Sequence, residues 1–302
     1  MRTALFTLVF QHRSLDEAIR MAAEVGYEAV ELLGREPHLP ADTSQERARR
    51  IKRVADGAGL RVACLATYTG GYSAKTDAEC LQELVNLEKC LKLAVILGCP
   101  LIRHDPGGPS ALVAGPEERA RAMAWMRKAA EVAQGYGKKL AMEIHNNSLV
   151  ETADAAALFL EELGADNVGV IHDAGNMYIT DTDYGAYSVQ RLGDRIFHVH
   201  VKDELRVEDD SLPRTFRDRT RHGEEIFQHN LLGEGAVDHL QLFTALVRAG
   251  YGGYLSAECH GTPDDRATAV HELAEIRRLV AQATGLARAA GGRLPGLPFH
   301  RV

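Results

Sequence analysis

The sequence predicts an α/β fold, a single (β/α)8 barrel with an insertion between the seventh strand and the seventh helix. Eight short apolar segments with strand character alternate with helical segments, and this strict alternation favours parallel pairing of the strands. The length of 302 residues fits one such barrel, which typically needs about 250 residues. An open, doubly wound parallel sheet is the alternative that the same alternation allows.

The first half of the chain contains four predicted pairs of strand and helix. Two helices open with a capping box, at Ser14–Glu17 and at Thr76–Glu79, in which the first turn satisfies its own free backbone groups. Gly26, Gly57 and Gly98 are typical residues to end the first three helices. The predicted strands are 3–10, 29–33, 61–66 and 99–104, and the helices run over 14–26, 44–56, 76–97 and 116–134.

The second half continues the alternation and contains two stretches that fall outside it. The predicted strands are 139–145, 168–173, 196–202 and 254–258, and helices are expected over 152–163, 183–192 and 237–249. The segment 203–232 is too polar for a core and is expected to be an inserted loop, which could act as a lid. The barrel domain is therefore expected to span 1–288, followed by an extended tail over 289–302 that is rich in Gly and Pro.

The composition is that of a globular protein, with 45% hydrophobic and 25% charged residues. A formal net charge of −7 disfavours nucleic acid as a partner, because phosphate contacts require clustered Lys and Arg. No apolar run reaches membrane-spanning length, and the run at 1–10 is too short for a secretory signal. Five cysteines without a C-x-x-C pair indicate reduced thiols, so we expect a cytoplasmic protein that does not contact a membrane.

Four strands of the second half each end on a side chain that can bind a metal ion. These residues, which share the same strand parity, are Glu143, Asp173, His200 and Glu258. The carboxyl ends of barrel strands meet at one face, so the four side chains should converge there. A single acidic residue at a strand end is more often a helix cap than a metal ligand. Independent caps, however, do not explain four such residues at successive strand ends with the same parity. Three carboxylates would repel one another without a cation, and the donor set suits Mn²⁺ best, with Mg²⁺, Co²⁺ and Zn²⁺ as alternatives.

The residues at these strand ends also carry a family resemblance. The segments concerned are 141–145 (AMEIH), 172–176 (HDAGN), 198–203 (HVHVKD), 232–235 (LGEG) with Asp238, and 257–258 (AE). Through them the sequence resembles the xylose isomerase-like TIM-barrel superfamily, which contains sugar phosphate isomerases and epimerases, and the likeness covers nearly the whole chain. The resemblance implies that the four residues named above hold one divalent metal ion. It also implies that Glu143 and Glu258 exchange protons with the substrate.

The activity implied by the resemblance is that of a divalent-metal-dependent sugar isomerase or epimerase. Such an enzyme removes a proton next to a carbonyl and proceeds through a metal-stabilised enediolate, with a small carbohydrate or polyol as substrate. Ketose 3-epimerases of the superfamily usually place a histidine where this chain has Asn176, which leaves a lyase acting on an inosose or a keto-glycoside as the alternative. A non-catalytic sugar-binding protein and an apurinic endonuclease are less favoured. The expected assembly is a homo-oligomer (dimer or tetramer) or a hetero-oligomer.

Further residues are candidates for contact with the substrate. His145 lies two residues beyond Glu143 on the same strand face, so it is a candidate base, or else a histidine hydrogen-bonded at the rim. Lys202 extends the face of His200 and could hold a substrate oxygen, or it pairs with a carboxylate such as Glu258. The predicted substrate-binding residues are His104, Asn176, Lys202 and Arg206, and the predicted catalytic residues are Glu143, Glu258, His145 and Lys202.

Overall fold

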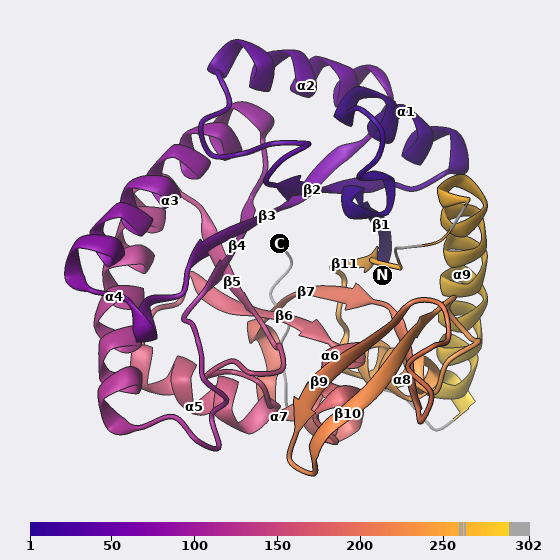
Figure 1. The fold of residues 1–302 in the computed structure, drawn as a ribbon. Helices are drawn as coiled ribbons and strands as arrows, with labels where there is room; N and C mark the ends of the chain where they lie inside the picture. The colour runs from indigo at the N-terminus through magenta and orange to yellow at the C-terminus, as the bar shows by residue number, and fades with distance from the viewer. Residues whose placement is uncertain (260–261, 263, 290–302) are drawn as a thin grey trace.

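The computed structural model describes residues 1–259, 262 and 264–289, and its centre is a closed barrel of eight parallel strands (Figure 1). The order around the barrel is β1-β11-β7-β6-β5-β4-β3-β2. The barrel strands are β1 (Arg2–Phe6), β2 (Ala29–Gly34), β3 (Arg61–Gly70), β4 (Leu101–Asp105), β5 (Lys139–Glu143), β6 (Val168–Asp173), β7 (Ile196–Val201) and β11 (Tyr254–Ala257). The closure confirms the predicted (β/α)8 fold and excludes an open sheet.

Helices cover the outside of the barrel (Figure 1). They are α1 (Leu15–Val25), α2 (Gln45–Gly57), α3 (Asp77–Leu97), α4 (Pro116–Gly135), α5 (Ala153–Leu163), α6 (Ala174–Ile179), α7 (Ala186–Leu192), α8 (His239–Ala249) and α9 (Asp265–Ala289). The capping box predicted for α1 is present, since Ser14 and Glu17 each accept from the backbone of the other, and α3 has the same arrangement at Thr76 and Glu79. Gly26 then ends α1 in the left-handed conformation, with φ of 103°.

Two helices, α6 and α9, are absent from the sequence prediction. The helix α6 follows β6 directly because the Asp173 side chain caps it, accepting from the Asn176 backbone N–H at 2.9 Å. The helix α9 packs against α1 and α8 and thereby completes the outer layer (Figure 1). Its buried face includes Leu273 and Ile276 at helical spacing, so the apolar pattern that predicts it is present in the sequence.

The predicted insertion forms a small antiparallel sheet rather than an irregular loop. Its strands are β8 (Asp203–Val207), β9 (Thr215–Thr220) and β10 (Gly223–Asn230), in the order β8-β10-β9. Phe227 of β10 is fully buried, and its ring contacts those of Phe216 in β9 and Tyr178 in α6. These contacts attach the inserted sheet to the barrel, and its β9–β10 hairpin projects from the barrel in Figure 1.

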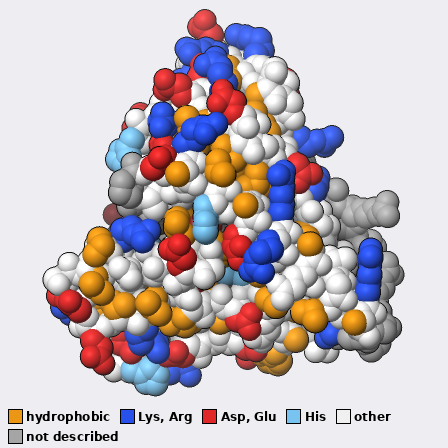
Figure 2. All heavy atoms as spheres, turned by 90° about the vertical axis from the view of Figure 1, so that its right-hand side faces the viewer, with side chains coloured by type: hydrophobic (Ala, Val, Ile, Leu, Met, Phe, Trp, Pro, Cys, Tyr) orange, Lys and Arg blue, Asp and Glu red, His pale blue; other side chains and the backbone are white. Residues whose placement is uncertain are grey.

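The predicted ends of the chain differ in detail from the structure. The first strand ends at Phe6, and the segment Thr7–Phe10, predicted to continue it, is a 3-10 helix. Ala289 is the last residue of α9, and the rest of the predicted tail, 290–302, lies outside the described residues. Among the described helices, none combines the length and the apolar character needed to cross a membrane. Acidic and basic side chains are interspersed on the face seen in Figure 2, in keeping with the modest net charge of −7.

Candidate metal centre and cavity

The carboxyl ends of four neighbouring strands bring together the four side chains that the sequence predicts as metal ligands. They are Glu143 at the end of β5, Asp173 at the end of β6, His200 in β7 and Glu258 directly after β11. One donor atom of each lies within 4.8 Å of those of the others, and all four residues are buried. Strand register explains the convergence, because His200 pairs with Asp173 on one side and with Ser256, two residues before Glu258, on the other.

His200 lies at the centre of this cluster. Its Nδ1 is 3.1 Å from Glu143 Oε1, 3.0 Å from Glu258 Oε2 and 3.6 Å from Asp173 Oδ2. Burial alone would lower the pKa of His200, but Glu258, Glu31 and Glu143 raise it well above its ordinary value. A proton on the His200 imidazole therefore neutralises part of the negative charge of the surrounding carboxylates. A cation bound at this position would neutralise the same charge.

A further acidic residue, Glu31 on β2, holds His200 from the opposite side. Both of its oxygens lie 3.1 Å from His200 Nε2, and Oε2 also accepts from His198 Nε2 at 2.9 Å and from Ser256 Oγ at 2.7 Å. Burial would raise the pKa of Glu31, but His200 and His198 hold it well below its usual range. Because an ionised carboxylate only accepts, Nε2 of His200 carries a hydrogen, and Nδ1 is the nitrogen that can bind a metal.

The donor set fits a divalent cation. Three carboxylates and one imidazole form an oxygen-rich set of the kind that binds Mn²⁺ or Mg²⁺, and Zn²⁺ also accepts these donors. Asp173 Oδ2 accepts no well-aligned hydrogen bond from the described residues, although Lys202 Nζ lies 2.9 Å away, so this oxygen has capacity for a further partner. The buried cluster can therefore bind a metal ion.

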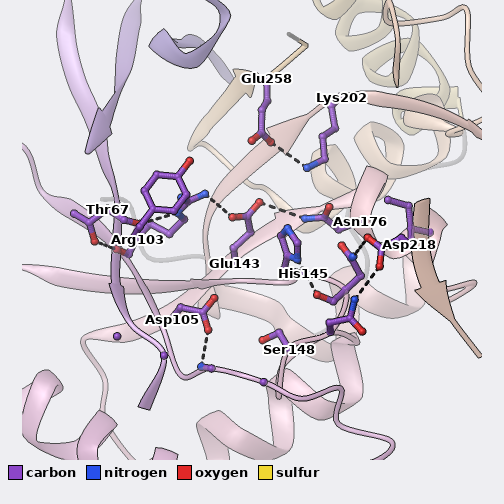
Figure 3. A pocket seen from close by; sticks show the side chains of 18 of the residues that line it. Thr67, Arg103, Asp105, Glu143, His145, Ser148, Asn176, Lys202, Asp218 and Glu258 are labelled. Atoms are coloured by element: carbon purple, nitrogen blue, oxygen red, sulfur yellow. Dashed lines mark hydrogen bonds and ion pairs between the residues drawn. The ribbon is translucent and has the colours of Figure 1, made fainter. Parts of the chain in front are cut away.

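Both oxygens of Glu143 have additional partners on the cavity side (Figure 3). Arg103 Nη1 lies 2.6 Å from Oε2, and Asn176 Nδ2 donates to Oε1 at 3.3 Å. Arg103 is itself fixed by a bond from Nε to Thr67 O at 3.1 Å and by the Tyr68 ring, 4.3 Å from its guanidinium carbon. Burial would raise the pKa of Glu143, but Arg103 and His200 hold it well below its usual range, so the carboxylate is ionised.

Lys202 follows β7 and continues the face of His200. Its Nζ is 2.9 Å from Asp173 Oδ2 and 3.3 Å from Glu258 Oε2, so the carboxylate pairing considered from the sequence is present (Figure 3). Burial would raise the pKa of Glu258, but His200 and Lys202 lower it to about 2. The lysine also lines the cavity, so its ammonium can reach a bound molecule.

His145 lies beside the cluster and is the most exposed of the predicted catalytic residues. Its Nδ1 lies 2.8 Å from the carbonyl oxygen of Asn146. Since a carbonyl oxygen only accepts, Nδ1 carries a hydrogen, and Nε2 is the nitrogen that can offer a lone pair. No described residue forms a hydrogen bond with this Nε2, and His145 lines the cavity (Figure 3). The imidazole is therefore in a position to accept a proton from a bound molecule.

A cavity of about 570 Å³ lies next to the cluster, and the inserted sheet forms one of its walls. The sheet contributes Glu204, Phe216, Asp218 and His229 to the lining. Asp218 also connects the sheet to the loop after β5, because it accepts from the side-chain amides of Asn146 and Asn147, the latter at 2.8 Å. The insertion is therefore a fixed wall in this structure, rather than a loop without contacts to the barrel.

Two of the predicted substrate-binding residues, His104 and Arg206, do not line the cavity. His104 is fully buried and hydrogen-bonded to Thr69 Oγ1 and Tyr72 OH, both at 2.9 Å, and burial lowers its pKa to about 3. Side chains alternate along a strand, so its neighbours Arg103 and Asp105 face the cavity instead. The Arg206 guanidinium is paired with Asp181 and Glu225, at 2.9 Å and 3.2 Å, and thus anchors the inserted sheet. The structure therefore does not bring these two predicted residues to the cavity.

Asn176 and Lys202, the other predicted substrate-binding residues, do line the cavity. Sequence reasoning missed three side chains of this centre, namely Glu31, Arg103 and Asp105. Glu31 interrupts the apolar run 29–33, and a charged residue in a buried strand is a signal that a partner lies inside the barrel. Arg103 and Asp105 would have been predicted if the odd-numbered residues of β4, rather than His104, had been assigned to the cavity face of the strand.

The chain belongs to the xylose isomerase-like TIM barrel family, whose model matches residues 19–279. Among curated relatives, an inosose dehydratase from Geobacillus kaustophilus is 27% identical over 144 residues, or 46% of this chain and 44% of that protein. The chain thus spans less than half the length of this relative. An L-ribulose 3-epimerase from Mesorhizobium japonicum is 26% identical over 254 residues, or 81% of this chain and 75% of that protein.

Solved structures show the same architecture. The probable 3-DHS dehydratase AsbF from Bacillus anthracis has a TM-score of 0.75 with this chain at 20% identity, covering 92% of this chain and 99% of that one. At this identity the likeness concerns the fold alone. The named relatives include epimerases and dehydratases, so the family membership supports an enzyme without choosing between these reactions.

Proposed function

We propose that this protein is a divalent-metal-dependent enzyme that removes a proton from the carbon next to a carbonyl group of a small carbohydrate or polyol. The observation that carries the proposal is the buried set Glu143, Asp173, His200 and Glu258 beside a polar cavity. A bound divalent ion, expected to be Mn²⁺, would act there as a Lewis acid toward a substrate oxygen. Isomerases, epimerases and dehydratases share this first step.

The protein groups around the cluster can perform the proton transfers. In an isomerase or epimerase, Glu143 and Glu258 would exchange protons with the substrate, as the family resemblance implies. Lys202 can donate a hydrogen bond to a substrate oxygen on which negative charge develops. His145 offers a third group, because the lone pair of its Nε2 is not occupied by a described residue.

The surroundings of Glu143 favour a dehydratase as the specific reaction. Arg103 and Asn176 already hold its two oxygens, which leaves His145 as the more accessible base. In the elimination, His145 Nε2 takes the proton next to the carbonyl, and the electron pair of that C–H bond forms the new double bond. The C–O bond to the β-hydroxyl breaks, and the hydroxyl leaves as water with a proton from Lys202. This assignment agrees with the position of Asn176, where a ketose 3-epimerase usually has histidine.

Metal analysis and proton exchange test the proposal. The purified protein should contain or bind about one divalent ion per chain, since the described residues form one cluster of four ligands. With ketoses and inososes in deuterated water, nuclear magnetic resonance should show deuterium entering next to the carbonyl, and a dehydratase should also release an unsaturated ketone that absorbs in the ultraviolet. Glu143→Gln and Glu258→Gln should each abolish exchange while the protein stays folded. A fully active double variant would refute the assignment.

A further inference from the structure

The cationic side chains of the cavity all have carboxylate partners. Five carboxylates and three cations are found among the residues that line it. The ion pairs are Lys75 Nζ with Glu83 Oε1 at 2.7 Å, Arg103 Nη1 with Glu143 Oε2 at 2.6 Å, and Lys202 Nζ with Asp173 Oδ2 at 2.9 Å. A phosphate or carboxylate group on a substrate would therefore compete with a carboxylate for each of these cations.

The backbone offers little for an anion either, although four glycines line the cavity. Glycine-rich loops bind phosphate through free N–H groups. Here the N–H of Gly70 donates to Glu83 Oε2 at 3.2 Å, and that of Gly71 to the carbonyl of Asp105 at 2.8 Å. The N–H of Gly107 donates to Asp105 Oδ1 at 2.6 Å. Three of the four glycine N–H groups are therefore occupied within the protein.

The cavity instead presents a buried acceptor without a donor. Glu204 of β8 is fully buried and lines the cavity. Its Oε1 lies 2.9 Å from His229 Nδ1, whereas Oε2 has no hydrogen bond with the described residues. A buried carboxylate oxygen without a partner is costly, so a ligand that supplies a donor to it gains affinity. A hydroxyl group is such a donor, and a phosphate or carboxylate group is not.

We propose that the substrate of this site is an uncharged polyhydroxylated ketone, a free sugar or cyclitol, and that one of its hydroxyls donates to Glu204 Oε2. The proposal rests on the proposed function and specifies its substrate class. It separates this chain from enzymes that act on sugar phosphates or on carboxylated rings. The inserted sheet would then be the element that selects the substrate, because it carries Glu204 and is attached to the barrel through Asp218.

Paired ligands test the substrate class on the full-length protein loaded with Mn²⁺. Calorimetric titrations would compare L-ribulose with L-ribulose 5-phosphate, D-fructose with D-fructose 6-phosphate, and an inosose with its phosphate. In each pair, the neutral ketone should bind at least about tenfold more tightly than its phosphate ester, since the phosphate competes with carboxylates already paired to the cations and cannot donate to Glu204. Tighter binding of a phosphate ester, or the failure of every neutral ketone to bind at millimolar concentration, would overturn the proposal.

Three variants test which carboxylates determine the preference for neutral ketones over phosphate esters. Glu204→Gln should weaken binding of the neutral ketones roughly ten- to hundredfold, the usual loss for one hydrogen bond to a charged group. Glu83→Gln removes the partner of Lys75 and should improve binding of the phosphate esters. Glu88→Gln is the matched control, because Glu88 lies on the same helix α3, points to Tyr136 and does not line the cavity. Unchanged binding of the neutral ketones by Glu204→Gln would contradict the role given to this residue.

The outcomes separate this inference from the proposed function. If neutral ketones bind through Glu204 but no deuterium exchange occurs, the reaction is wrong and the substrate class stands. If exchange occurs only with phosphate esters, the reaction stands and the substrate class is wrong.

Discussion

Replacement of Glu31 by Gln is expected to weaken metal binding although Glu31 is not a proposed ligand. In the structure, Glu31 Oε2 accepts from His198, His200 and Ser256, whereas Oε1 faces His200 Nε2 alone among these donors, at 3.1 Å. A glutamine that keeps its oxygen at the Oε2 position therefore places its NH₂ group against His200 Nε2. This contact competes with the bond from His200 Nε2 to the remaining oxygen and shifts His200 toward the tautomer with its hydrogen on Nδ1, which is the nitrogen needed by the metal. Loss of such an outer partner typically costs about 10–100-fold in metal affinity, or about 1.4–2.8 kcal/mol.

The assay is a competition titration of Mn²⁺ against a fluorescent chelator, with circular dichroism to confirm folding. Glu151→Gln is the matched control, because Glu151 is also buried and accepts from Ser110 Oγ, outside the metal cluster. We expect the control to bind Mn²⁺ like the wild type. A folded Glu31→Gln protein that binds Mn²⁺ within twofold of the wild type, a limit of about 0.4 kcal/mol, would refute the reasoning.

Three further outcomes are expected. Glu272 lies on the buried face of α9, and burial raises its pKa to about 7. The stability that its protonated carboxyl contributes is therefore complete below about pH 4.5 and is lost as the pH rises through 7. In Glu272→Gln this pH-dependent loss, up to about 3 kcal/mol of the free energy of unfolding, should be absent. Thermal unfolding at pH 5 and pH 8 would measure it, and a variant with the pH dependence of the wild type would contradict the expectation. His145→Gln should lower kcat at least about 100-fold with unchanged Mn²⁺ affinity, and near-normal turnover would exclude it as the base. Arg103→Met removes the partner of Glu143 Oε2, while Oε1 keeps His200 and Asn176, and should reduce the free energy of unfolding by up to about 3–5 kcal/mol in urea titrations, whereas a loss below about 1 kcal/mol would show that the pair is not needed.

The barrel and the four converging side chains could be predicted because both depend on local patterns. Strands and helices follow from apolar periodicity and capping residues, and the order of strands in a closed parallel barrel follows from the order in the chain. Once Glu143, Asp173, His200 and Glu258 are placed at successive strand ends, their convergence needs no further information. The missed helix α9 also has a helical apolar pattern, so its absence from the prediction was an omission rather than a limit of the sequence.

Other features of the site depend on information that the sequence pattern does not contain. The choice between His104 and Arg103 as the inward residue is a choice of parity, and the short strand β4 is compatible with both until its end at Asp105 is known. The bond between Glu31 and His200 joins residues 169 positions apart, across the barrel interior. The inserted segment gave no strand prediction, since its charged side chains lie on a small, largely exposed sheet.

The end of β7 connects the metal cluster to the wall that we propose selects the substrate. Three consecutive residues have different roles there, because side chains alternate in an extended chain. Lys202 pairs with the ligand carboxylates, and Glu204 faces the cavity. Asp203, between them, accepts from the backbone N–H groups of Gly233, Gly235 and Val237 at 2.9, 3.1 and 3.0 Å. It thereby ties the far end of the insertion back to β7, so a change at Asp203 should displace Lys202 and Glu204 together and affect substrate affinity and turnover in the same variant.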